Sequence, residues 1–167
     1  MNNIKVPLRY LPKTLSKKDR KKQSQMLLKS RRLYKQGKYY TRNALPSYPH
    51  KVSSHIRDAQ RIYGLKTIAP NDELAKATGC SVNALKKIVS KGEGAYFSSG
   101  SRPNQTAQSW GIARLASSVT GGNAAVVDFS IIQEGCDHKK RAFKMANATR
   151  KKRNNKLRKA ITTTLHR

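Results

Sequence analysis

The chain has very few acidic residues. Only 8 of its 167 residues are Asp or Glu, against 36 Lys and Arg, so the formal net charge at pH 7 is +28. It also lacks an apolar run of the roughly 20 residues needed to span a bilayer, and no hydrophobic signal peptide follows Met1. So strong a charge needs an anionic partner, because the chain otherwise repels itself in water. We expect a soluble intracellular protein that meets nucleic acid, acidic protein surfaces or anionic lipid.

Cysteine is scarce as well, with only Cys80 and Cys136. Two distant cysteines without a paired motif are typical of a reducing compartment, and a disulfide between them is left open. With His55 and His138 they make four candidate zinc ligands, of which only Cys136 and His138 are close in sequence. Zinc sites usually bring their ligands in two close pairs. We therefore expect no metal and no cofactor.

Catalytic groups are equally few. Acid–base catalysis needs paired or perturbed carboxylates, or a histidine in a pocket. Asp72 and Glu73 suit the first turn of a helix, and Asp58 is explained by an ion pair with a neighbouring arginine. Asp128 alone has no evident structural role. We predict that the protein is not an enzyme, with no catalytic residues and no small-molecule substrate.

The basic charge lies mainly at the two ends. Residues 1–52 have a net charge of +14, residues 53–135 of +3, and residues 136–167 of +11. We expect a basic N-terminal arm and docking segment, a compact core domain, and a basic C-terminal helix or tail with these boundaries. The expected fold class is α+β: a small, mainly helical core with a helix-turn-helix-like pair and a short β-sheet, flanked by extended or helical basic arms.

Most of the predicted contacts with an anionic partner lie in the arms. Ser16 and Asp19 form a capping box that predicts a helix to about Gln36, with Gly37 as its stop. Because this helix has few apolar residues, we expect a partner to stabilise it. The predicted partner-binding or anion-binding residues are Lys17, Lys18, Arg20, Lys21, Lys22, Arg31, Arg32, Arg102, Arg150, Lys151, Lys152 and Arg153.

Residues 1–14 and 37–52 are expected to be extended. Pro7 and Pro12 favour an arm that docks on a neighbour rather than folding alone. In residues 37–52, tyrosines alternate with basic residues, as at Lys38, Tyr39 and Tyr40. Such a strip stacks on bases in single-strand binders, but tyrosines also suit any protein interface, and we favour the interface.

Residues 71–92 predict two helices and a tight turn. Asn71 caps the first helix, Gly79 ends it in the left-handed conformation, Ser81 caps the second, and Gly92 ends that one. This is the helix-turn-helix pattern, although a helical hairpin in any core uses the same caps. If the pair contacts DNA, the residues expected to face it are Asn83, Lys86 and Lys87.

The remainder of the core is predicted to mix helices and short strands. We expect strands at residues 65–68, at Tyr96 and Phe97, and at residues 125–132, which are β-branched and aromatic. Residues 98–105 indicate a loop, and Thr106 caps an apolar helix expected to be the buried centre. That loop and helix start are a candidate phosphate or carboxylate site, although a capped loop needs no ligand. Asp137 is expected to cap a last helix from about residue 139.

Five segments of the chain carry a family resemblance: residues 5–12, 37–42, 79–88, 96–106 and 110–122. They resemble a family of small basic proteins of nucleocytoplasmic large DNA viruses, such as chlorella viruses and giant viruses of protists. The resemblance covers most of the chain, and it supplies no catalytic residues because the family's domain is uncharacterised.

The resemblance implies a virion setting, in which small basic proteins often cement the capsid lattice from inside. We predict a structural minor capsid protein of a large icosahedral DNA virus, made in the host cytoplasm and located in the virion. Its basic arms would bridge the major capsid protein, other minor capsid proteins or the inner membrane. The alternative is a virion- or genome-associated DNA-binding protein that holds viral DNA with the helix-turn-helix-like core and polycationic tails.

Overall fold

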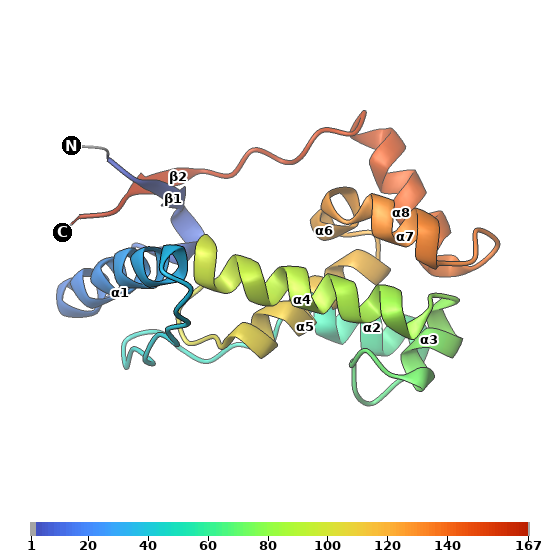
Figure 1. Ribbon diagram of the computed structural model, residues 1–167, viewed down its shortest axis with the longest axis horizontal. Helices are drawn as coiled ribbons and strands as arrows, with labels where there is room; N and C mark the ends of the chain where they lie inside the picture. The colour runs from blue at the N-terminus through green and yellow to red at the C-terminus, as the bar shows by residue number, and fades with distance from the viewer. Residues whose placement is uncertain (1–2, 167) are drawn as a thin grey trace. The chain divides into compact units, whose positions relative to one another are not determined.

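The computed structural model describes residues 3–166. In that range the chain forms eight α-helices, one 3-10 helix and a two-stranded sheet (Figure 1). This confirms the mainly helical α+β class. By internal contacts the chain divides into two units. Unit 1 is Met1–Lys51, Glu93–Trp110 and Lys159–Arg167, and unit 2 is Val52–Gly92 and Gly111–Arg158. These units differ from the three segments defined by charge, and the charge-based division stays a prediction.

Unit 1 contains the only sheet among the described residues. Its elements are β1 (Lys5–Pro7), η1 (Leu8–Tyr10), α1 (Lys17–Lys35) and β2 (Thr162–Thr164), with the last turns of α4 (Val82–Ser98) and the start of α5 (Ala107–Val119). β1 pairs antiparallel with β2, so that Val6 lies opposite Thr163 near the two chain ends (Figure 1). The first segment is therefore partly extended, as expected, but it pairs within its own chain.

α1 packs on a core of its own unit. Ser16 Oγ accepts a hydrogen bond from the Asp19 amide at 3.2 Å, and Gly37 follows the helix with a φ of 72°, as the caps predict. The helix has more contact with its own chain than its sequence indicates, because Leu27 is fully buried and polar residues of the same face are hydrogen-bonded. The expected stabilising partner stays a prediction. Gln23 donates to the Tyr10 carbonyl at 3.0 Å. One cluster of buried apolar residues in unit 1 consists of Val6, Tyr10, Leu11, Leu15, Leu27, Leu45 and Leu165.

The regular elements of unit 2 are all helices. It consists of α2 (Ser54–Tyr63), α3 (Asp72–Thr78), α6 (Asn123–Val127), α7 (Phe129–Gly135), α8 (Arg141–Lys152) and the remaining parts of α4 and α5. Thr106 caps α5 as predicted, accepting the Ser109 amide at 3.1 Å, and residues 115–119 of α5 are all buried. The fully buried core residues of unit 2 include Leu74, Leu85, Ile88, Leu115, Val119, Ile132, Ala142 and Ala146.

Three predicted strands are wrong. Residues 65–68 form a loop, and Tyr96 and Phe97 lie in the last turns of α4. Residues 125–132 belong to α6 and α7, apart from Asp128, which lies between the two helices. The burial pattern explains the last error: Ala125, Asp128 and Ile132 are buried at i, i+3 and i+7, which is a helical period. β-branched composition favours a strand, but it is overridden where the core contacts recur every turn of a helix.

Gly92 does not end α4, which continues to Ser98. A Cβ atom on Gly92 would lie 2.6 Å from the Cα atom of Gly111 in α5, a distance that no side chain tolerates. The glycine is needed here because two helix backbones approach each other closely. Its helix-stopping role, expected from the sequence, is wrong for that reason.

The C-terminal region differs from the expected tail. α8 begins at Arg141, and Asp137 instead accepts the Lys139 amide at 2.9 Å in the preceding turn. A basic helix or tail is expected here, but the end of the segment pairs with β1, and Leu165 is 6% exposed. Among the described residues, no helix has both the length and the apolar character needed to cross a membrane.

Candidate nucleic-acid interface

The predicted pair of helices is present as α3 and α4. Asn71 Oδ1 accepts the Leu74 amide at 3.0 Å, and Gly79 adopts a left-handed φ of 78°. Ser81 Oγ accepts the Ala84 amide at 3.1 Å at the start of α4. These contacts confirm the three predicted caps, because each satisfies backbone groups that a helix end leaves without a partner. The connection between the two helices is only three residues long.

A disulfide and two backbone bonds hold this turn. Cys80 is bonded to Cys136, between α7 and α8, and the two residues also form an isolated antiparallel bridge. The Ser81 amide donates to the Gly135 carbonyl, and the Asp137 amide donates to the Gly79 carbonyl, both at 2.8 Å. The disulfide that the sequence leaves open is therefore present in the structure. Cys80 and Cys136 are 56 positions apart in the sequence. They meet because the connection between α7 and α8 packs against the turn, and the sequence pattern does not reveal this packing.

α4 presents one apolar face and one polar face within unit 2. Leu85 and Ile88 are fully buried, and Ala84 and Val89 are nearly so. Five polar residues of the same turns are exposed, and we call them the α4 arc: Asn83, Lys86, Lys87, Ser90 and Lys91. At 3.6 residues per turn, these positions span about 140° of the helix circumference. The arc contains three cations and no carboxylate.

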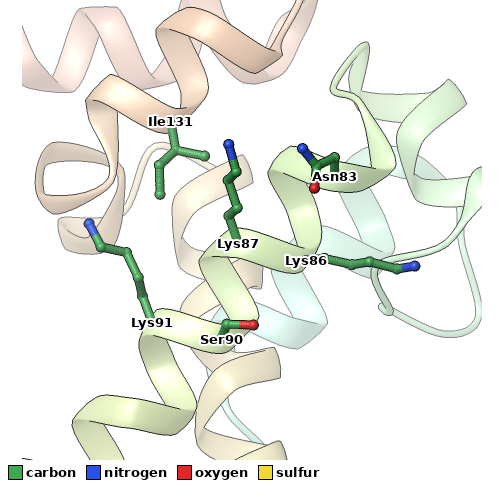
Figure 2. Close-up of a pocket in the computed structure, with 6 residues that line it drawn as sticks. All are labelled: Asn83, Lys86, Lys87, Ser90, Lys91 and Ile131. Carbon is green, nitrogen blue, oxygen red and sulfur yellow. The ribbon is translucent and has the colours of Figure 1, made fainter.

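The α4 arc lines a shallow groove. Its cavity volume is about 440 Å³, and Ile131 of α7 completes the lining. Figure 2 shows Lys87 and Lys91 extending toward the side on which Ile131 lies, whereas Lys86 extends away from them. Asn83, Lys87 and Lys91 are four residues apart, so they form one row along the helix. The groove is thus open to an elongated anionic ligand that follows α4.

The three lysines of the α4 arc differ in whether a carboxylate lies nearby. Lys91 Nζ lies 3.9 Å from Asp128 Oδ1, and its side chain is half exposed. Asp128 is fully buried and already holds Arg114 and Ser118, so it attracts Lys91 only in part. Within residues 3–166, neither Lys86 nor Lys87 lies within ion-pair distance of a carboxylate. These two ammonium groups are therefore available to an external anion.

A family model for a "Family of unknown function (DUF5824)" matches residues 7–141. The chain belongs to this family. The DUF5824 match contains α3, the turn, the α4 arc and both cysteines of the disulfide, and it stops at the first residue of α8. The basic run of residues 150–153 lies outside the DUF5824 match. No curated protein and no solved structure matches the chain.

The structure separates the predicted basic residues into two groups. Four arginines are used inside the fold: Arg20 donates to the Leu11 carbonyl at 3.0 Å, Arg31 to the Ser99 carbonyl at 2.7 Å, and Arg153 to Asn123 at 2.6 Å. Arg150 donates to Asn147 and lies over the Phe129 ring. The remaining predicted residues are exposed: Lys17, Lys18, Lys21, Lys22, Arg32, Arg102, Lys151 and Lys152.

Two members of the arc were absent from the prediction. Ser90 and Lys91 lie four residues after Lys86 and Lys87, so helical periodicity was the signal that could have found them. Ile131 was beyond reach, because its segment was expected to be a strand rather than α7.

A buried arginine in unit 1 was also missed. Arg42 is 6% exposed, and it donates to Ser30, to the Tyr96 carbonyl and to Ser101 at 2.8–2.9 Å. Its guanidinium lies 3.8 Å from the centre of the Tyr96 ring. Burial lowers the pKa of Arg42, because the charged form loses water. Its donors are directed at groups of its own unit, so its role is structural.

The structure also assigns roles to the side chains considered for chemistry. Asp128 accepts two hydrogen bonds from Arg114, which gives this buried carboxylate a structural partner. Cys80 and Cys136 are joined to each other and are not metal ligands. In the part of the chain that the structure describes, no three His, Cys, Asp or Glu side chains gather as a metal site.

Proposed function

We propose that the protein binds nucleic acid, with the α4 arc lying against the phosphate backbone. The observation that carries this proposal is the row of lysines on one exposed helix face without a carboxylate among them. Lysine ammonium groups bind phosphates as point charges, and the net charge of +28 adds long-range attraction. The disulfide and backbone bonds at the turn hold α4 in position for this contact.

The arrangement supports phosphate contact more than base reading. Ile131 of α7 borders the groove into which Lys87 and Lys91 extend, and Gly135 packs against Ala84 at the start of α4. A recognition helix must enter a groove of about 12 Å, which leaves little room for a flanking helix. Of the arc residues, Asn83 alone has the bidentate amide that reads adenine. We therefore expect weak sequence preference.

The test is duplex binding measured against salt concentration. The Lys86→Ala/Lys87→Ala variant should weaken binding on the order of tenfold and reduce the salt slope by about 2, since two phosphate contacts are lost. The matched control is Lys66→Ala/Lys144→Ala, which removes the same charge from two exposed residues of unit 2 outside the arc. Equal losses in both variants would show that α4 is not the interface.

A role as a minor capsid protein is the second candidate, supported by the resemblance to virion proteins and by the exposed lysines of α1. These lysines would pair with acidic patches of the major capsid protein. It ranks second because α1 already packs on a core of its own chain. Mild dissociation of purified virions would decide: recovery of the protein with the DNA, while the shell stays complete, would rule out the capsid role.

A further inference from the structure

An exposed group of aromatic rings in unit 1 has no evident role in folding. Tyr39 is 72% exposed and Tyr34 is 37% exposed. The ring centre of Tyr39 lies 6.2 Å from that of Tyr34 and 5.0 Å from that of Phe97. We call these three residues the aromatic cluster. Large exposed aromatic surfaces usually mark a contact with a ligand or a partner.

The aromatic cluster has a rigid foundation. Phe97 lies edge-on to Tyr96, with ring centres 5.1 Å apart, and Tyr96 is fully buried. The Tyr96 hydroxyl accepts the Arg42 amide at 2.9 Å and donates to the Gln105 carbonyl at 3.1 Å. On the other side, Ser30 of α1 donates to the Phe97 carbonyl at 3.1 Å. The Tyr39 ring therefore packs on a Phe97 that these contacts hold in place, which reduces the entropy cost of ordering Tyr39 on binding.

The surroundings of the aromatic cluster favour an anion. Arg32, Lys35 and Lys38 are exposed, and the last two are the chain neighbours of Tyr34 and Tyr39. Unit 1 contains 18 Lys and Arg but only two carboxylates, Asp19 and Glu93. Asp19 is buried and accepts the Ser47 amide at 2.9 Å. Hydrogen bonding from the Ser47 side chain, and then from its amide, lowers the pKa of Asp19. The ligand that fits these rings therefore has both flat aromatic faces and repeated negative charge.

We propose that the aromatic cluster binds single-stranded nucleic acid. Unpaired bases would stack on Tyr39 and Tyr34, while the adjacent phosphates meet Lys35, Lys38 and Arg32. In a duplex the base faces are hidden in the stack, so the same rings have nothing to bind. An acidic peptide meets the cations but offers few flat faces. This surface belongs to unit 1, whereas the α4 arc belongs to unit 2, so the inference does not rest on the arc.

The experiment measures binding of a labelled oligothymidylate of about ten nucleotides, a length within the range that single-strand binders cover. Tyr39→Ala should weaken binding about 5- to 160-fold, since stacking of one base contributes about 1–3 kcal/mol. Tyr39→Phe keeps the ring and should bind within about twofold of the wild type. The same losses are expected on oligouridylate, because both sugars leave the base faces free.

Three further measurements separate stacking from charge. Tyr39→Ala should leave the affinity for duplex unchanged. Its affinity for an abasic strand of about ten nucleotides should also equal that of the wild type. In the Lys86→Ala/Lys87→Ala background, Tyr39→Ala should still cause its loss of single-strand affinity. The proposal for the α4 arc and the proposal for the aromatic cluster can therefore be refuted separately. The proposal would be overturned if Tyr39→Ala bound oligothymidylate as tightly as the wild type does. It would also be overturned if Tyr39→Ala and Tyr39→Phe lost the same amount of affinity. Because Tyr39 is so exposed, the thermal midpoint of both variants should match the wild type.

Discussion

The guanidinium of Arg114 binds the carboxylate of Asp128 through two hydrogen bonds, from Nε to Oδ2 at 2.9 Å and from Nη2 to Oδ1 at 2.7 Å. Asp128 is fully buried between α6 and α7, and the Arg114 side chain is 19% exposed. Ser118 donates a third bond at 2.9 Å. A buried charge is tolerated only when it is paired and hydrogen-bonded, and this carboxylate meets both conditions.

Removing that carboxylate should be costly. Asp128→Ala leaves the Arg114 charge without its partner, and we expect the free energy of unfolding to fall by about 3–5 kcal/mol in urea titrations. The control is Asp58→Ala, which breaks the exposed pair of Asp58 with Arg61 and should cost less than about 1 kcal/mol. A loss at Asp128 no larger than that at Asp58 would contradict the assigned structural role.

The disulfide between Cys80 and Cys136 should stabilise the fold by restricting the unfolded chain. It closes a loop of residues 56 positions apart, for which the chain-entropy relation gives about 4 kcal/mol. A reductant should therefore lower the thermal midpoint of the wild type on the order of 10 °C. The double variant Cys80→Ala/Cys136→Ala should start from the lower midpoint and show no response to the reductant. An unchanged wild-type midpoint would count against this stabilisation.

Stability should decrease at alkaline pH because of Tyr63. Burial raises the pKa of Tyr63 from its ordinary value of 10.0 to about 12, and its hydroxyl donates to the Val119 carbonyl. Between these two values the unfolded chain has lost a proton that the folded protein keeps, so the free energy of unfolding falls as the pH rises. Lysines titrate nearby, so the comparison must be with Tyr63→Phe.

We expect the difference in stability between wild type and Tyr63→Phe to shift in favour of the variant from pH 10 to pH 12, as measured by urea unfolding at each pH. Below pH 10 the difference should be constant, since neither state of the wild type then ionises this group. A constant difference across the whole range would show that the pKa of Tyr63 is not raised by folding.

Much of the local structure follows from the sequence. Ser16, Asn71, Ser81 and Thr106 each cap a helix as predicted, and Gly79 ends α3 in the left-handed conformation. Such caps depend on groups within three or four residues, so their patterns are readable without the rest of the fold. The same locality explains why Asn83, Lys86 and Lys87 were placed together on one exposed face.

The wrong predictions of secondary structure fall where contacts with a distant segment of the chain determine the conformation. Gly92 looks like a helix stop, but the approach of Gly111 makes it an interior position of α4. Residues 125–132 have the composition of a strand, yet the burial of Ala125, Asp128 and Ile132 makes them helical. Local propensities are weak, a fraction of a kcal/mol per residue, so tertiary packing overrides them.

The candidate sites divide in the same way. The sequence by itself determined the strong positive charge, the helix caps and the polar face of α4, because charge and period are properties of neighbouring residues. Only the tertiary structure decided that Cys80 meets Cys136, that Arg114 neutralises Asp128, and that Tyr39 lies exposed beside Phe97. Each of these pairs joins residues more than ten positions apart, and such pairs meet only when the helices pack.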